Sequence, residues 1–163
     1  MPNLINHFPE VLTTCRFYLE LKLDGSQDPV DAYFMECKGL KRSQAAIEVC
    51  EVSPRHWGKA KSGQLVHTKL PGNVKTSNLT LRRGMTQSTT LWNWFEAVQA
   101  GNWAKQLRDG SLTLYDQLGN TQALFQFGGA FPLSYLVSDL NASGGELAIE
   151  EMELAIETFT RQR

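Results

Sequence analysis

Apolar and polar residues alternate one by one along several stretches of this chain, and this period constrains the fold more than any other feature. Residues 15–23, CRFYLELKL, place Phe17, Leu19, Leu21 and Leu23 on one side of an extended chain and Arg16, Tyr18, Glu20 and Lys22 on the other. Such alternation is typical of a β-strand with one face in the core. Further strands are predicted at residues 32–38, 43–52, 78–83, 111–116, 122–127, 131–137 and 147–159.

The last predicted strand changes phase along its length. Its apolar residues fall on one side at Leu147 and Ile149 and on the other at Met152, Leu154 and Ile156. One additional residue near Glu150-Glu151 would reconcile the two halves. We therefore predict a β-bulge there, or a strand that passes from one sheet to another.

One segment has helical periodicity instead. A helix over residues 88–100 places Leu91, Trp94, Phe95 and Val98 on one stripe, and Trp92 lies next to it. Ser88 is the candidate N-cap and Gly101 the candidate stop. We expect these aromatic and aliphatic side chains to pack against a sheet. The sequence therefore predicts a mainly β fold, an antiparallel β-barrel or sandwich with one packed α-helix, in a single domain over residues 1–163.

Residues 53–76 do not fit a compact domain. They form a long predicted loop that holds several glycines, prolines and basic residues but few large apolar ones. Loops of this length are usually functional or disordered. We interpret the segment as an arm that becomes ordered against another subunit, and the alternative is a mobile surface loop. Its candidate contacts are Trp57 and Leu70 as apolar anchors, Lys59, Lys61 and Lys69 as partners for carboxylates, and the adjoining Pro71 and Gly72.

Composition places the chain among ordinary globular proteins. Its 163 residues are 42% hydrophobic with a formal net charge of −1, so no overall field attracts it to nucleic acid or membranes. The start, MPNLINHFPEVLTT, lacks the features of a signal peptide, and no run is long enough to span a membrane. The cysteines Cys15, Cys37 and Cys50 are expected to be buried, reduced thiols. These features predict a protein made in a cytosol.

Known catalytic and metal-binding motifs are absent from the sequence. His7, His56 and His67 lack metal-ligand spacing, and there is no phosphate-binding or nucleophile motif. The acidic run at residues 150–157 is expected to be a solvated strand face rather than a catalytic carboxylate pair. Arg82, Arg83 and Gly84 form a predicted turn that either grips a phosphate or pairs with a carboxylate of a neighbouring subunit. We therefore expect neither an enzyme nor a bound cofactor or metal.

Several segments in order resemble one known family. They are KGL at 38–40, EVSPRHWGKAKSG at 51–63, TKLPGNVKTSNLTLRRGMTQSTTLWNWFEAVQAGNW at 68–103, RDGSLTLYDQ at 108–117, AFPLSY at 130–135 and DLNASGGELAIEEMELAIE at 139–157. This pattern resembles the inner tube protein of phage-tail-like contractile injection systems over nearly the whole chain. The sequence departs from the family at Phe131 before Pro132 and at residues 156–159, IETF. These substitutions keep the strand character.

The resemblance implies a subunit of hexameric rings that stack into a hollow tube inside a contractile sheath. The implied partners are further copies of the chain, the sheath, the baseplate hub and spike, a tail terminator and cargo in the lumen, with no requirement for nucleic acid and no membrane insertion. The implied particle is released or tethered to a membrane. Parity gives the candidate lumen residues as Gln44, Glu48, Glu151 and Glu153. The alternatives are a tube-like ring near the baseplate and a small β-barrel that binds a ligand or single-stranded nucleic acid.

Overall fold

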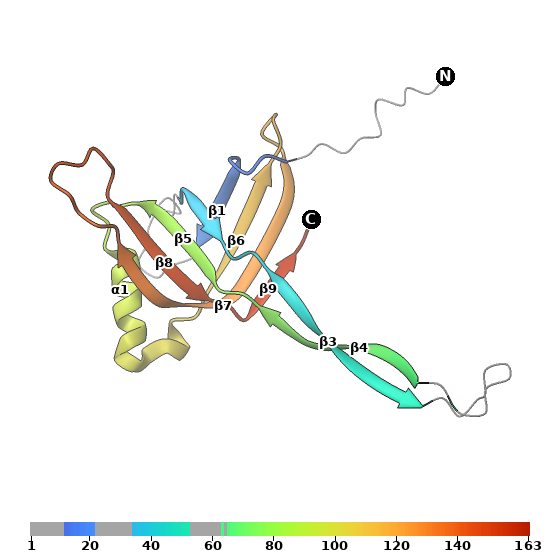
Figure 1. The fold of residues 1–163 in the computed structure, drawn as a ribbon. Coiled ribbons are helices and arrows are strands. Elements are labelled where there is room, and N and C mark those ends of the chain that lie inside the picture. The colour runs from blue at the N-terminus through green and yellow to red at the C-terminus, as the bar shows by residue number, and fades with distance from the viewer. Residues whose placement is uncertain (1–11, 22–33, 53–62, 64) are drawn as a thin grey trace, which may run out of the picture. The chain divides into compact units, whose positions relative to one another are not determined.

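The computed structural model describes residues 12–21, 34–52, 63 and 65–163. The strands are β1 (Phe17–Leu21), β2 (Glu36–Lys38), β3 (Arg42–Val52), β4 (Leu65–Thr76), β5 (Leu79–Gly84), β6 (Arg108–Tyr115), β7 (Thr121–Val137), β8 (Ile149–Ala155) and β9 (Thr158–Arg161) (Figure 1). The helix α1 (Thr90–Ala97) continues as a π-helical turn over Val98–Asn102 and a 3₁₀ turn over Trp103–Lys105. The mainly β fold with one α-helix is thus confirmed.

The chain divides into two compact units. The first comprises residues 1–40 and 77–163, and the second comprises residues 41–76. Among the described residues, the first unit holds a seven-stranded antiparallel sheet and the second holds β3 and β4.

Strand β7 organises the sheet of the first unit. The sheet order is β1-β6-β7-β8-β5-β2, and β9 also pairs with β7. The first half of β7 lies between β6 and β9, whereas its second half, from Phe131 to Val137, pairs with β8. Gly129, with φ of +65°, lies between the two halves in a conformation that other residues rarely adopt. The two strands predicted at residues 122–127 and 131–137 are therefore one strand.

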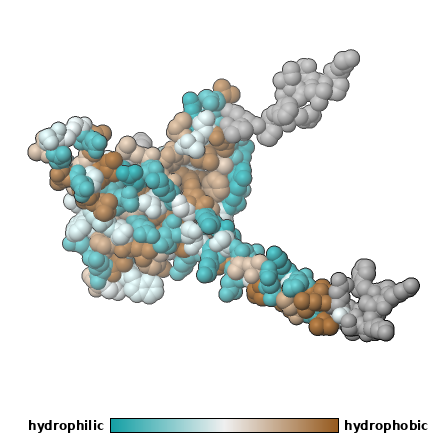
Figure 2. All heavy atoms as spheres, in the orientation of Figure 1, coloured by the Kyte–Doolittle hydropathy of each residue, from teal (hydrophilic) through white to brown (hydrophobic). Residues whose placement is uncertain are grey.

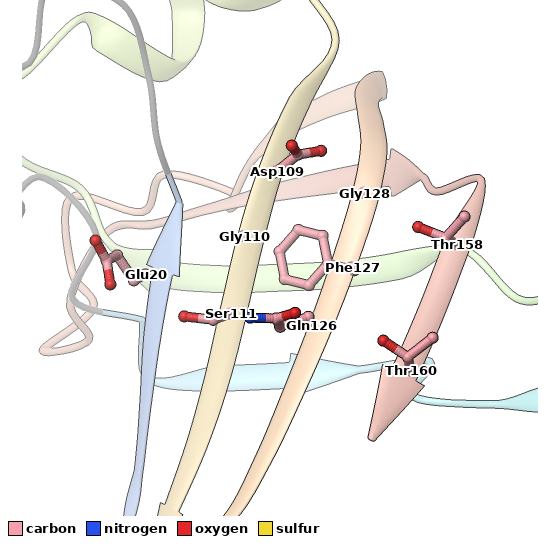
Figure 3. Close-up of a pocket in the computed structure, with 9 residues that line it drawn as sticks. All are labelled: Glu20, Asp109, Gly110, Ser111, Gln126, Phe127, Gly128, Thr158 and Thr160. Carbon is pink, nitrogen blue, oxygen red and sulfur yellow. The ribbon is translucent and has the colours of Figure 1, made fainter. Parts of the chain in front are cut away.

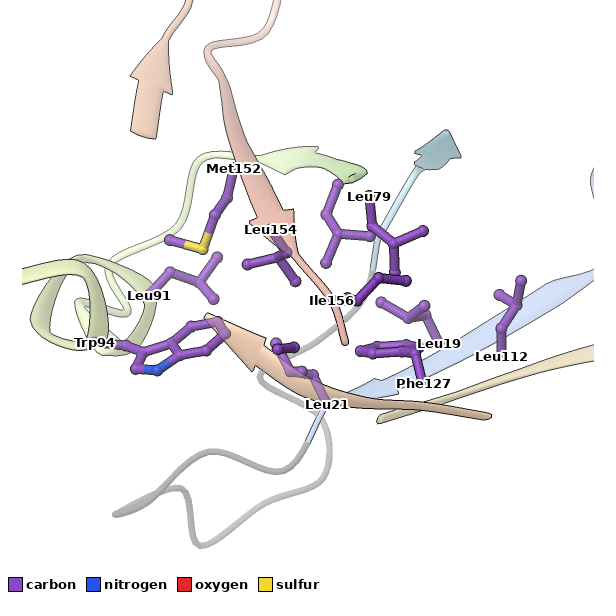
Figure 4. Close-up of a cluster of buried hydrophobic side chains, with 12 residues drawn as sticks. Leu19, Leu21, Leu79, Leu91, Trp94, Leu112, Phe127, Met152, Leu154 and Ile156 are labelled. Carbon is purple, nitrogen blue, oxygen red and sulfur yellow. The ribbon is translucent and has the colours of Figure 1, made fainter. Parts of the chain in front are cut away.

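The core fills the inner face of this sheet. It consists of Leu19, Leu21, Leu79, Leu81, Leu91, Trp94, Leu112, Phe127, Ala130, Met152, Leu154 and Ile156 (Figure 4). Leu79 and Leu81 are 0% and 1% exposed, as the alternation along residues 78–83 predicts. Burial of each such side chain contributes about 1.5–3 kcal/mol, so this face holds the unit together.

Helix α1 packs on the sheet through the predicted stripe. Leu91 and Trp94 are buried, and Phe95 and Val98 are partly buried against the core. The indole Nε1 of Trp94 donates a hydrogen bond to the carbonyl oxygen of Gln106 at 2.8 Å, so this buried donor is satisfied. Trp92 lies on the more exposed side, where its ring meets Tyr135 edge-on with centroids 5.3 Å apart.

The ends of the helix match the prediction in part. The residue before the first turn is Thr89, not Ser88, and it makes no capping hydrogen bond through its side chain. Gly101 has φ of +94°, the left-handed conformation expected of a helix stop, although it lies in the π-helical turn beyond α1.

The hairpin turn between β6 and β7 is held by one carboxylate. Asp116 Oδ1 accepts hydrogen bonds from the backbone N–H groups of Leu118 and Asn120 at 2.9 and 2.8 Å. Its Oδ2 accepts from the side-chain amide of Gln122 at 2.9 Å. These bonds, with Gln122 the largest cause, lower the pKa of Asp116 to about 2. The turn connects the strands predicted at residues 111–116 and 122–127.

The predicted bulge near Glu150-Glu151 is wrong. Strand β8 pairs with β5 from Ile149 to Leu154 without a register shift. The pattern changed phase because Glu150, which is only 4% exposed, occupies an inward position in line with Met152 and Leu154. The change of strand partner occurs later, between β8 and β9.

The second unit is a two-stranded antiparallel ribbon, which we call the β3–β4 ribbon. Its register runs from Arg42 opposite Thr76 to Val52 opposite Leu65, with an irregularity between Gln44 and Ala46. Residues 65–76 of the predicted arm are therefore a strand and not a loop, and its partner, β3, is a strand predicted at 43–52. The candidate contacts Trp57, Lys59 and Lys61 lie outside the described residues.

Candidate assembly surfaces

One face of the β3–β4 ribbon is apolar and exposed. Ile47 lies opposite Leu70, Val49 opposite Thr68, and Val66 lies further along the same face. Ile47, Leu70 and Val66 are 53%, 48% and 42% exposed, and Figure 2 shows apolar side chains at the surface of this ribbon. We call this the apolar ribbon face (Ile47, Val49, Val66 and Leu70). An isolated two-stranded hairpin is only marginally stable in water, so exposed apolar side chains on such a hairpin mark a candidate contact with another chain.

The opposite ribbon face carries two polar cross-strand pairs, which lie between the apolar pairs Ala46–Pro71 and Val52–Leu65. Lys69 Nζ lies 3.3 Å from Glu48 Oε1, and both side chains are largely exposed, so their attraction contributes at most about 1 kcal/mol. The next pair along is Cys50 with His67, whose Sγ and Nδ1 atoms are 3.1 Å apart.

The ribbon irregularity brings two further candidate residues together. The side-chain amide of Gln44 donates to the carbonyl oxygen of Gly72 at 3.2 Å, and Pro71 lies opposite Ala46. A Cβ atom on Gly72 would lie 3.0 Å from the carbonyl oxygen of Ala45, so glycine permits this close approach.

A charged surface covers the outer side of β2, β5 and β8 in the first unit. Arg82 Nη1 contacts Glu36 Oε2 at 2.8 Å, and its Nε contacts Glu151 Oε2 at 3.1 Å. Lys38 Nζ also reaches Glu36, at 2.9 Å. Hydrogen bonds from Lys38 and then from Arg82 lower the pKa of Glu36, and the bond to Glu36 raises the pKa of Arg82. Cations and anions on neighbouring strands thus compensate one another.

Glu153 completes this surface, which we call the charged sheet face (Glu36, Lys38, Arg82, Glu151 and Glu153). Its Oε1 accepts a hydrogen bond from the side-chain amide of Asn78 at 2.8 Å. Of the candidate lumen residues, Glu151 and Glu153 therefore share one sheet, whereas Gln44 and Glu48 belong to the ribbon in the other unit.

The predicted turn at Arg82-Arg83-Gly84 is wrong, because all three residues lie in β5. Successive side chains of a strand point to opposite faces, so Arg82 joins the charged sheet face while Arg83 points inward and is 3% exposed. The position of Gly84 at the strand end leaves open space where a Cβ atom would lie, so packing does not demand a glycine there.

Arg83 belongs to a buried polar group that we call the Glu150 cluster (Arg83, Glu150 and Tyr135). Arg83 Nε forms an ion pair with Glu150 Oε1, and the hydroxyl of Tyr135 donates to Glu150 Oε2. Burial and then the Glu150 carboxylate raise the pKa of Tyr135 to about 12. The ring of Tyr135 also contacts Trp92 and Phe95, so the cluster links strands β5, β7 and β8 to α1.

The Glu150 cluster escaped the sequence analysis, although a signal for it exists. Arg83 continues the inward parity of Leu79 and Leu81, and it lies directly opposite Glu150 in the register. When each of two paired strands has one charged residue among its inward apolar residues, and the two charges are opposite in sign and in position, the pattern predicts a buried ion pair.

The sheet of the first unit leaves strand edges open. Among the described residues, β1 pairs only with β6, β2 only with β5, and β9 only with β7. A cleft of 630 Å³ lies against β1, β2 and β6, and its apolar lining includes Phe17, Cys37, Leu40 and Leu112. Unpaired edges next to apolar side chains are sites where another chain can add.

A second cavity, of 440 Å³, has a polar lining on β1, β6, β7 and β9 (Figure 3). Asp109 and Glu20 supply its carboxylates, and Asp109 Oδ1 accepts a hydrogen bond from the backbone N–H of Gly129 at 3.1 Å. The remaining side chains are hydroxyls, an amide and the ring of Phe127.

The cysteines differ from the expectation of three buried thiols. Cys37 is partly buried, and this burial raises its pKa to about 11, but Cys15 and Cys50 are exposed. Cys15 precedes β1, and Cys50 lies on a ribbon whose two faces both meet solvent. In the part of the chain that the structure describes, no group of three or more His, Cys, Asp or Glu side chains is arranged to hold a metal ion.

No helix within the described residues has the length and apolar character needed to cross a membrane.

Comparison with known proteins gives one family and several solved structures. The family model described as T4-like virus tail tube protein gp19 matches residues 13–160. No curated protein matches the chain.

Two similar structures come from an extracellular contractile injection system, PVC, in its extended state. A chain of the sheath/tube terminator structure has a TM-score of 0.71 at 21% identity and covers 95% of this chain and 99% of its own length. A chain of the sheath-tube complex has a TM-score of 0.70 at 22% identity and covers 96% and 93%.

A third similar chain, from the six-fold symmetrised anti-feeding prophage (AFP) baseplate, has a TM-score of 0.64 at 18% identity and covers 94% and 97%. These likenesses confirm the fold over nearly the whole chain.

Proposed function

Because this chain belongs to the T4-like virus tail tube protein family, we propose that it is a structural subunit of the hollow inner tube of a contractile injection system. The subunits form hexameric rings that stack inside a contractile sheath, and cargo is delivered through the lumen. The proposal rests on the family match over residues 13–160. The similar structures, which are those of a sheath-tube complex, a sheath/tube terminator and a six-fold symmetrised baseplate, support these partners.

The open strand edges support assembly with further copies. Copies that supply partners for β1, β2 or β9 satisfy backbone groups and cover apolar side chains at once. A ring of identical subunits needs two different surfaces that meet head to tail through a rotation that closes. Open edges at β1, β2 and β9 provide such unlike surfaces.

The apolar ribbon face is our candidate contact with an adjacent subunit or ring. Leu70 and Ile47 stand opposite each other on this face, and their burial between copies contributes about 1.5–3 kcal/mol for each side chain. Lys69 already pairs with Glu48, so it supports the ribbon while remaining available to a neighbour's carboxylate. Pro71 and Gly72 adjoin this contact, and Trp57, Lys59 and Lys61 remain predicted contacts of the same arm.

The charged sheet face is our candidate lumen wall. It lies opposite the core side of the sheet, on which α1 packs, and its ion pairs are formed within the chain. Two of its three carboxylates, Glu36 and Glu151, are paired with cations, and Glu153 accepts only from the neutral amide of Asn78. The wall therefore carries a small net negative charge and attracts polyanions least. Glu151 and Glu153 thus keep their proposed place in the lumen, and Gln44 and Glu48 remain candidates on the ribbon. The family role is structural, and we propose that the subunit performs no catalysis.

Electron microscopy of the purified full-length chain tests the tube. We expect hollow rods of stacked rings, whose length grows with protein concentration. A second candidate, a tube-like ring next to the baseplate, is favoured by the likeness to a chain of the AFP baseplate. Single rings that never stack identify that second role, and a monomer that stays monomeric at high concentration contradicts both.

A further inference from the structure

The three cysteines of the chain lie in three different environments. Cys37 is partly buried against the core. Cys15 is exposed, and its Sγ lies 3.7 Å from the hydroxyl of Thr13. Cys50 is also exposed, but its Sγ lies 3.1 Å from Nδ1 of His67. Only Cys50, among these three described thiols, is therefore paired with a side chain that can remove its proton.

The β3–β4 ribbon fixes the geometry of this pair. Cys50 and His67 are directly opposite each other in the strand register, so their side chains emerge on the same face. The ion pair of Lys69 with Glu48 is the next cross-strand pair on that face. This face is opposite the apolar ribbon face, and both ring and thiol are exposed to reagents in solution.

A thiol becomes a strong nucleophile only after it loses its proton, and an adjacent imidazole is a common acceptor. A separation of 3.1 Å places Nδ1 within direct reach of the thiol proton when that nitrogen is unprotonated. The ammonium group of Lys69, two residues along the strand, is paired with the carboxylate of Glu48, so this ion pair adds little net charge beside the sulfur.

We propose that Cys50 and His67 form a site of covalent thiol modification, which takes small-molecule disulfides. In this step Nδ1 of His67 accepts the thiol proton while Sγ of Cys50 attacks one sulfur of the disulfide. The S–S bond of the reagent breaks, a new S–S bond joins its sulfur to Cys50, and the second half leaves as a thiolate that takes up the proton. The disulfide reagent is reduced to one thiol as Cys50 is oxidised to a mixed disulfide.

The test measures adduct formation at each cysteine of the full-length chain with glutathione disulfide as the probe. Mass spectrometry of the quenched protein and its peptides gives a rate for each site. We expect Cys50 to react about tenfold faster than Cys15, which serves as the exposed thiol without an imidazole partner. Cys37 should remain unmodified until the protein is denatured.

Variants then assign the effect to the imidazole. We expect His67→Gln to slow Cys50 to about the rate of Cys15, without change at Cys15, since the general base is lost. Lys75→Gln, at the other end of the same strand, is the matched control and should leave all rates unaltered. Lys69→Gln should have a smaller effect than His67→Gln.

Three outcomes overturn the proposal. In the first, Cys15 in the unmodified chain reacts as fast as Cys50, a comparison that needs no variant. In the second, His67→Gln leaves the rate at Cys50 unchanged. In the third, Lys69→Gln slows Cys50 as much as His67→Gln, which would assign the effect to local charge. None of these results bears on tube formation, so the thiol site and the proposed function fail independently.

Discussion

Glu150 is the residue that most distinguishes this core from a purely apolar one. Its carboxylate lies on the core side of the sheet, where it pairs with Arg83 and accepts a hydrogen bond from the hydroxyl of Tyr135. Such a buried pair need not stabilise a fold more than apolar side chains of similar size. Removal of one partner, however, leaves a buried charge without compensation, and this asymmetry can be measured.

We predict that Arg83→Met lowers the free energy of unfolding by about 3–5 kcal/mol, because Glu150 then stays buried without its ion-pair partner. The double variant Arg83→Met with Glu150→Leu should recover most of this loss. Urea unfolding followed by circular dichroism measures both. Additive losses in the double variant would argue that the two residues act separately. Tyr135→Phe removes only the hydrogen bond to Glu150, and we expect it to lower the free energy of unfolding by about 1–2 kcal/mol.

Asp116 gives a second prediction for a single residue, this time on pH. Its pKa in the folded chain is lowered to about 2 from an ordinary value of 3.8. A carboxyl with a lowered folded pKa stabilises the fold above its unfolded pKa, and this contribution is lost as pH falls through the folded pKa. The stability difference between the natural chain and Asp116→Asn should therefore shrink as pH drops from about 4 to about 2. A difference that stays constant over this range would show that the charge of Asp116 does not matter.

At the scale of elements, the β3–β4 ribbon is where sequence and structure diverge most. Strands β1 and β5 and the hairpin of β6 and β7 follow from alternation, since each has one face in the core. Strand β4 was missed because neither face of the ribbon is buried within its unit, so its residues need not alternate. Pro71 and Gly72 at the irregularity disguised it further.

The candidate site was predictable to a similar degree. Leu91 and Trp94 follow from helical periodicity because packing on a sheet demands it. The burial of Arg83 does not follow from the sequence in this way, because two adjacent arginines before a glycine resemble an exposed turn. Only the partner strand, with Glu150 at the matching position, shows that one of them faces inward.

The ribbon supplies a prediction for its own apolar face. Leu70→Asp combined with Ile47→Asp should leave a folded subunit that no longer assembles, because charged groups cannot be buried between copies without a large cost. Electron microscopy scores the tubes, and thermal unfolding checks the fold. Ala46→Asp, on the opposite ribbon face, is the matched control and should still assemble. Normal tubes from the double variant would exclude the apolar ribbon face as a contact.

At the scale of the whole molecule, the proposed placement of Arg82 decides how assembly responds to salt. Its ion pairs with Glu36 and Glu151 lie within one chain, as expected for a lumen wall. We predict that Arg82→Gln forms tubes at low and at high salt alike, as judged by sedimentation and microscopy. A defect at low salt that high salt relieves would instead assign Arg82 to an ionic contact between subunits, since salt screens exposed charges.

Strand β7 carries a mechanical consequence. Its 17 residues run through both parts of the sheet. A continuous backbone therefore connects the part in which β7 pairs with β6 and β9 to the part in which it pairs with β8. A force applied to one part of the sheet is transmitted to the other through the covalent bonds of β7. Under a sudden mechanical force, the interfaces between neighbouring subunits should therefore separate before the sheet of any one subunit unfolds.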